Sequence, residues 1–172
     1  MKRWWDRRDR DEELEPQSPL EPESPSEPEL PVDSLLVRPL TMARVAELIR
    51  AEGYSCEDDG EGEVRGIWNE VGFRFFLSPD DTWLGISTVW EAPDDFPVGM
   101  HSALQEASND WNRQFLQPTA YPSTDEDKIV FFYSVFVDAG LSDQQFSQML
   151  DRALDVNLQA HRTIASLLPP VL

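Results

Sequence analysis

The chain has 172 residues, of which 33 are Asp or Glu and 14 are Lys or Arg, so its formal net charge is −19. This length predicts one folded domain, with room for an appended segment. The strong acidity argues against nucleic acid as a partner, because its phosphate backbone would be repelled. A single cysteine excludes an internal disulfide and a multi-cysteine zinc site.

Two kinds of membrane-directed segment are not predicted from the sequence. No charged start is followed by an apolar run of about 7–15 residues, as a signal peptide requires. No stretch of about 20 consecutive apolar residues is long enough for a spanning helix. We therefore expect a cytoplasmic protein without a transmembrane segment.

Residues 1–34 differ in composition from the rest of the chain. They carry five basic and 11 acidic side chains, and six of the 14 prolines recur at every third position between residues 16 and 31. A segment with so few large apolar residues cannot bury enough surface to offset the entropy of ordering it. We predict a disordered tail, in which the acidic, proline-rich stretch 11–34 is a spacer with polyproline II character.

The first ten residues form a basic tip that contains two neighbouring tryptophans, Trp4 and Trp5. One interpretation is a docking segment for an acidic surface, a membrane face or the acidic side of the folded domain. A segment this short would give only weak peripheral membrane contact. The other interpretation is a disordered terminus whose tryptophans are incidental. Composition leaves both interpretations open.

From Leu35 onward the pattern is globular, and we assign residues 35–172 to one α+β domain. A helix is predicted over residues 42–52, with Thr41 as its N-cap and a glycine directly after it. Residues 56–63 are predicted to form an acidic, glycine-bearing turn. Three predicted strands follow, at residues 64–68, 73–77 and 83–90.

The second half of the domain is predicted to contain a helix, a long strand and a final helix. A helix with one apolar stripe is predicted over residues 100–115. The strand at residues 128–137 is apolar on both faces, which is typical of a central strand covered on both sides. Ser142 and Gln145 fit the capping box of a third helix, which continues to about residue 168.

The predicted order is α-β-β-β-α-β-β-α, an antiparallel sheet of about five strands with three helices. Three helices suffice to cover one face of such a sheet. An apolar second face then needs another cover, and a second copy of the chain is the simplest one. We therefore expect a homodimer.

No motif in the sequence supports catalysis. Cys56, His101 and His161 are the first candidates, but acidic neighbours raise the pKa of a thiol and weaken it as a nucleophile. The acidic turn fails the EF-hand pattern, because Gly66 stands where the loop needs a glutamate. Phosphate-binding loops, HExxH and GxSxG are missing as well. We predict that the chain is not an enzyme and holds no metal or cofactor.

Aromatic residues gather on the predicted strands, and the third helix has an apolar face wider than one sheet contact needs. Most of these side chains should form the core. A remaining apolar strip would bind a segment of a protein partner, with the acidic rim selecting among partners. The candidate partner-binding residues come from the tip, the strands and the third helix: Trp4, Trp5, Trp68, Trp83, Trp90, Met149, Val156 and Ile164.

Residues 109–115 read Asn-Asp-Trp-Asn-Arg-Gln-Phe, which resembles the YbjN family, whose second helix carries an Asn-x-Trp-Asn…Phe run. The Gly-Tyr pair after the first helix agrees, as does the Gly-Leu-Ser before the third, so the resemblance covers about residues 38–168. It implies the fold of type III secretion chaperones, dimeric acidic proteins that hold unfolded segments of client proteins. It also implies structural roles, in the core or capping nearby backbone, for Asn109, Trp111, Asn112 and Phe115.

The leading hypothesis is a non-enzymatic, dimeric protein-binding module that acts as a chaperone or adaptor. The alternative is a regulatory, signal-transduction protein controlled by its tail, which would dock on the domain and be released by a signal such as phosphorylation of Ser18 or Ser24. A remote alternative is an enzyme with an unrecognised site.

Overall fold

The computed structural model describes residues 35–93, 101–123 and 127–168, so the predicted tail and its two tryptophans lie outside the described residues. The helices are α1 (Met42–Ala51), α2 (His101–Gln114) and α3 (Asp143–Leu167). The strands are β1 (Glu57–Asp58), β2 (Glu63–Trp68), β3 (Val71–Leu77), β4 (Trp83–Glu91), β5 (Thr119–Pro122) and β6 (Lys128–Phe136). No described helix is long and apolar enough to cross a membrane.

The six strands form one antiparallel sheet in the order β1-β2-β3-β4-β6-β5. The predicted α+β class is confirmed, with one strand more than expected. The additional strand is β1, which lies within the segment predicted as a turn and pairs with β2 at the edge of the sheet. Asp59 explains the pairing, because its Oδ1 accepts hydrogen bonds from the backbone N–H groups of Glu61 and Glu63, at 2.8 and 3.0 Å, and closes a hairpin.

Side-chain caps fix where the helices begin. The predicted capping box is confirmed, since the Gln145 N–H donates to Ser142 Oγ at 3.1 Å and the Ser142 N–H donates to Gln145 Oε1 at 2.9 Å. Thr41 Oγ1 likewise accepts a hydrogen bond from the Arg44 N–H at 3.2 Å. Gly53, after α1, has φ +85°, which a glycine adopts without strain.

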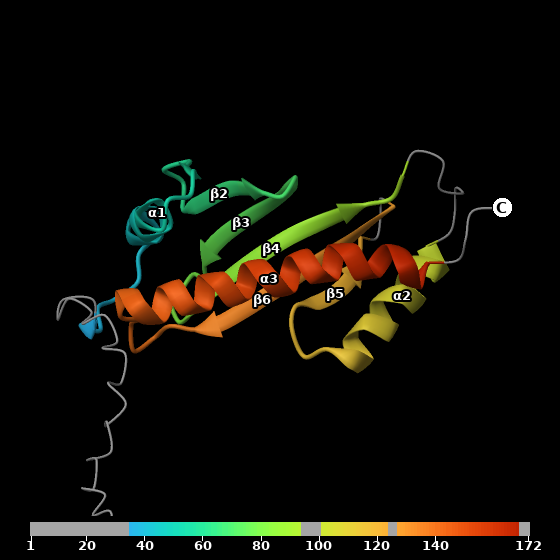
Figure 1. Cartoon of the computed structure of the whole chain (residues 1–172). Helices are drawn as coiled ribbons and strands as arrows, with labels where there is room; N and C mark the ends of the chain where they lie inside the picture. Colours follow the sequence, from blue (N-terminus) through green and yellow to red (C-terminus); the bar gives the residue numbers. More distant parts are fainter. Residues whose placement is uncertain (1–34, 94–100, 124–126, 169–172) are drawn as a thin grey trace, which may run out of the picture.

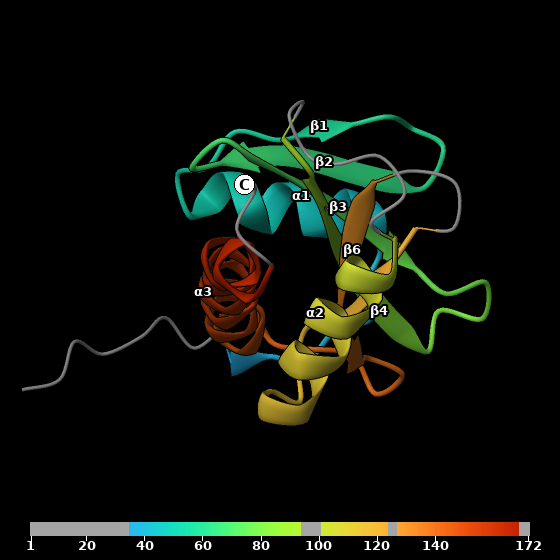
Figure 2. The same cartoon turned by 90° about the vertical axis from the view of Figure 1, so that its right-hand side faces the viewer.

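All three helices pack on the same face of the sheet, which curves around them (Figures 1 and 2). They enclose two core clusters. The first lies between α1, the strands β2 to β4 and the N-terminal part of α3, and its largest buried members are Ile49, Phe75, Leu84, Ile86, Phe146 and Leu150. The second lies between α2, β5, β6 and the C-terminal part of α3, with Leu104, Trp111, Ile129, Phe131, Ala160 and Ile164.

Between the two clusters, three polar side chains link β4 to α3. Thr88 Oγ1 donates its one proton to Asn157 Oδ1 at 3.2 Å. Thr88 Oγ1 therefore accepts the hydrogen bond that joins it to His161 Nε2 at 2.9 Å. Asn157 Nδ2 donates in turn to the Ala153 carbonyl at 2.8 Å. Burial lowers the pKa of His161 to about 4, so the imidazole is neutral at pH 7. The structure thus places His161, one of the candidate catalytic residues, against the core.

Acidification should therefore destabilise the fold through His161. Its pKa falls from an ordinary 6.5 to about 4 in the folded chain, so the unfolded chain binds more protons between these two pH values. Stability contributed by the neutral imidazole is lost as the pH drops through this window. Urea unfolding at pH 7 and pH 5 should show a larger loss of unfolding free energy in the wild type than in His161→Gln, whose amide can still donate to Thr88. An equal loss in both proteins would contradict this account.

Candidate functional site

The face of the sheet opposite the helices, called the open face below, has no helix packed on it among the described residues. Strand register places side chains of every long strand there, because Arg65 pairs with Arg74, Arg74 with Ser87, and Ser87 with Phe132. Alternate residues of each strand point to this side. Its apolar members are Ile67, Phe76, Trp83, Val89, Tyr121, Val130, Phe132 and Phe136.

At one end of the open face, Phe76, Trp83 and Phe132 pack together, and Phe136 lies beside them. The ring centroids of the first three are 5.7–6.0 Å apart. Gly85 makes this packing possible, since a Cβ there would lie 2.7 Å from the Phe76 ring and 2.9 Å from the Trp83 ring. The side chain of Phe136 is 80% exposed. We call these four aromatic residues the aromatic end.

A groove of about 1140 Å³ crosses the rest of the open face. Its floor is apolar, formed by Ile67, Val89, Tyr121 and Val130. Three of these side chains are unusually accessible for their size, since Ile67 is 75% exposed, Tyr121 47% and Val89 44%, while Val130 is half-buried. Small-ligand sites commonly measure about 300–1,000 Å³, and this open groove, with lining residues from all six strands, is larger and has room for a peptide segment.

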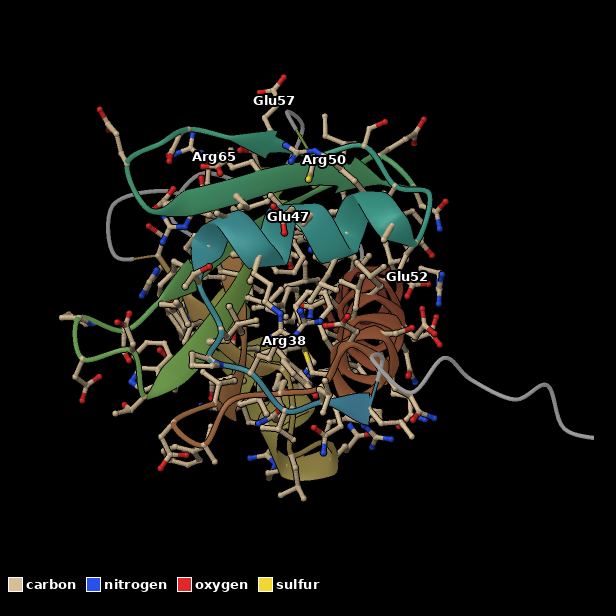
Figure 3. The ribbon with its side chains drawn as sticks, turned by 90° about the vertical axis from the view of Figure 1, so that its left-hand side faces the viewer. Arg38, Glu47, Arg50, Glu52, Glu57 and Arg65 are labelled. Atoms are coloured by element: carbon tan, nitrogen blue, oxygen red, sulfur yellow. The ribbon has the colours of Figure 1, made fainter. Side chains whose placement is uncertain are left out.

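Charged side chains border the groove, and both of the cations that line it are in ion pairs. Arg65 lies 2.7 Å and Arg74 3.6 Å from carboxylate oxygens of Glu63. Within the described part of the chain, the carboxylates of Glu57 and Glu70 form neither an ion pair nor a hydrogen bond. Figure 3 shows Glu57 projecting from the edge strand, away from α1. Glu57 stands opposite Arg65 in the β1–β2 pairing and its charge acts on that guanidinium without a close contact. The rim therefore offers negative charge that is in no close ion pair, beside an apolar floor.

The candidate nucleophile and the histidines are not assembled into a catalytic set. Burial, partly offset by Arg50, raises the pKa of the Cys56 thiol, whose Sγ lies 3.6 Å from the Ala46 carbonyl oxygen. Over residues 35–93, 101–123 and 127–168, no hydrogen bond joins Cys56 to His101 or His161. In the same ranges no cluster of three His, Cys, Asp or Glu side chains could hold a metal ion.

The structure separates the residues that the sequence singled out for partner binding. Trp83 lies on the open face, at the aromatic end. The others that are described pack on the helix side. Met149 and Ile164 are buried in the two core clusters, and Trp68, Trp90 and Val156 are partly buried against them. These five side chains are therefore occupied within the chain, and they contribute no exposed surface to the open face.

Sequence reasoning missed most of the open face. Ile67, Val89, Tyr121 and Val130 stand at alternate positions to the buried residues of their own strands, so the twofold strand period contained the signal. Periodicity divides a strand into two faces without saying which face the helices cover. The strand at residues 128–137, predicted to be covered on both sides, is covered by helices on one side only.

The Asn-x-Trp-Asn…Phe run fastens α2 to β5. The Trp111 indole is buried, donates from Nε1 to the Pro118 carbonyl at 2.7 Å and stacks on Phe115 with ring centroids 4.0 Å apart. Asn112 donates to the Ala120 carbonyl at 2.7 Å and accepts from the Ala120 N–H at 2.8 Å, as a neighbouring strand would. Asn109, expected to cap backbone, is instead exposed and accepts from the Gln105 side chain at 3.3 Å.

Comparison with known proteins agrees with this architecture. Among solved structures, the chain is similar to YbjN, "a putative transcription regulator from E. coli", with a TM-score of 0.60, 15% identity, and coverage of 78% of this chain and 100% of that chain. It is also similar to a chain of the ExsC–ExsE complex, with a TM-score of 0.51, 19% identity, and coverage of 72% and 95%. A chain of the HopA1–SchA chaperone–effector complex has a TM-score of 0.49 and 16% identity, with coverage of 73% of this chain and 97% of that chain.

At these identities the likenesses show the fold alone, which is the type III secretion chaperone-like fold that the sequence predicts. A search of curated protein sequences gave no match. The family model described as "YbjN: Putative bacterial sensory transduction regulator" matches residues 41–165. Because this match spans most of the chain, the chain belongs to the YbjN family.

Proposed function

We propose that the chain is a cytoplasmic, non-enzymatic protein-binding module, chaperone- or adaptor-like, that holds an apolar segment of a partner protein in the groove of the open face. One observation carries the proposal: three helices occupy one face of the sheet and leave the other apolar and accessible. Contiguous exposed apolar surface on a folded protein marks an interaction site, because leaving it in water costs free energy.

The anatomy of the groove supports a peptide as its occupant. An apolar centre formed by Ile67, Val89 and Val130 is bordered by charged side chains, which matches the core-and-rim arrangement of protein interfaces. The structure that contains one of the similar chains is a complex of two proteins, ExsC and ExsE. A partner segment with alternating apolar and basic side chains would satisfy both the floor and the unpaired Glu57 and Glu70.

Placing a crosslinker in the groove tests this function. We expect the photoreactive residue benzoylphenylalanine at Val89 to crosslink one partner protein in the source organism. The same residue at Gln159, exposed on α3, should not crosslink it, because that position lies on the opposite side of the molecule. Val89→Glu should weaken capture of that partner on the order of tenfold or more, since the added carboxylate is buried in the interface. Equal crosslinking from both positions would contradict the proposal.

We also propose that the chain acts as a homodimer. Support comes from the aromatic end, where Phe136 and its neighbours present the aromatic surface that is enriched in interface cores. A second copy seated there would remove this surface from water and leave the groove accessible. Analytical ultracentrifugation at micromolar concentration should give the mass of two chains, and a monomer under these conditions would contradict the dimer.

A further inference from the structure

The described part of the chain begins on the helix side of the fold, between α1 and the start of α3. The backbone of Arg38 pairs with Leu141, with N–H to carbonyl distances of 3.1 and 3.0 Å in the two directions. Arg38 and Arg44 both bind Asp143, at 2.8 and 2.6 Å. These contacts fix the first described residues to the connection between β6 and α3, directly after Phe136 (Figure 1). Residues 1–34 therefore start from the end of the sheet that carries the aromatic end, but on the helix side, so the tip has to pass around an edge of the sheet to enter the open face.

Those 34 residues divide sharply in charge. The tip, residues 1–10, has five cationic and two anionic side chains, and the spacer, residues 11–34, has nine anionic and none that is cationic. The folded part, residues 35–172, carries nine cationic and 22 anionic side chains. The tip is thus the one strongly basic stretch in an acidic chain, and it also holds Trp4 and Trp5.

The spacer is long enough to bring the tip to the groove. About 30 residues separate Trp5 from Leu35, and a flexible chain of that length spans about 30 Å on average. The longest strands have nine residues, or about 30 Å at 3.3–3.4 Å per residue. In polyproline II geometry the same spacer has a length of about 90 Å, at about 3.1 Å per residue, so the tip reaches the groove when the spacer bends back over the domain.

The chemistry of the groove matches the tip. Its apolar floor of Ile67, Val89 and Val130 suits indole rings, and the unpaired carboxylates of Glu57 and Glu70 suit the neighbouring Lys2 and Arg3. Arg65 and Arg74, the cations that would oppose a basic segment, are both held by Glu63.

We propose that the tip of the chain docks in the groove of the same chain through Trp4 and Trp5 and competes there with a partner segment. This inference rests on the proposed function, since it makes the tip an internal competitor for the same site. A tether of this length gives an effective concentration on the order of 1 mM. A tip that binds with a dissociation constant of about 0.1 mM would then fill most grooves and weaken partner binding about tenfold.

Amide spectra of the full-length, ¹⁵N-labelled chain test the docking. Trp4→Ser combined with Trp5→Ser should shift the amide signals of Ile67, Val89 and Val130. The matched control, Leu20→Ser with Leu30→Ser, removes two apolar side chains from the spacer and should leave these signals in place. If the amide chemical shifts of the groove residues are the same in the wild type and the tryptophan variant, the proposal is overturned. Shifts that are confined to the aromatic end would overturn it as well.

A second arm identifies the ligand as the tip itself. A synthetic peptide of residues 1–12, added to the tryptophan variant, should return the groove signals towards their wild-type positions with saturation. The same peptide with both tryptophans replaced by serine should not. Unlabelled wild type added to the labelled tryptophan variant should also change nothing, because each tip occupies its own groove. Restoration by the unlabelled wild type would overturn docking within one chain.

The outcome separates this inference from the proposed function. If Val89 crosslinks a partner and the tryptophan variant leaves the groove signals unchanged, the groove binds partners and the tip does not regulate it. If the peptide fails to bind and Val89 crosslinks nothing, the groove itself is not a binding site. Where the tip does dock, the tryptophan variant should capture the partner about tenfold more tightly than the spacer control.

Discussion

The packing of α3 along the sheet is the interaction on which the rest of the structure depends. This helix has 25 residues and contributes to both core clusters, with Phe146 and Leu150 in the first and Ala160 and Ile164 in the second. Because α1 and α2 flank it on the same side, all three described helices pack on one face of the sheet and none packs on the other. The open face, with its groove and aromatic end, is the direct consequence of that arrangement.

Local signals were sufficient to predict most of the fold. The capping box at Ser142 and the strand alternation around Phe75 and Phe131 depend on neighbours a few residues apart, so the sequence shows them directly. The strand β1 escaped prediction because two residues carry no periodicity. Its pairing depends on one carboxylate, that of Asp59, accepting two backbone hydrogen bonds.

The candidate site was harder to predict, for a physical reason that α3 illustrates. Its apolar face is wider than one contact needs, and the sequence cannot say whether the surplus meets a partner or a second core cluster. Met149 and Ile164 turn out to serve the two clusters. In the same way, Trp68 shares its strand face with Val64 and so packs inward, while Ile67 between them points outward. Which face is covered is a tertiary property.

Acidity has a more specific meaning once the open face is known. The charge is not uniform over the surface of the groove, where the single carboxylate of Glu63 contacts both Arg65 and Arg74, while Glu57 and Glu70 are in no close ion pair. A surface of this kind favours segments that are apolar and basic over segments that are only apolar. The proposed holding of a partner and the proposed control by the tip would be two uses of one surface, and the balance between them would depend on which segment is present.

Cross-saturation NMR on a complex of the deuterated chain with its protonated partner is the most direct test of this account. Saturation of the partner's protons should attenuate the amide signals of Ile67, Val89 and Val130, which line the groove, and leave that of Gln159, exposed on α3, unchanged. Attenuation on the helix side with an unaffected groove would contradict the claim that the open face is the binding surface.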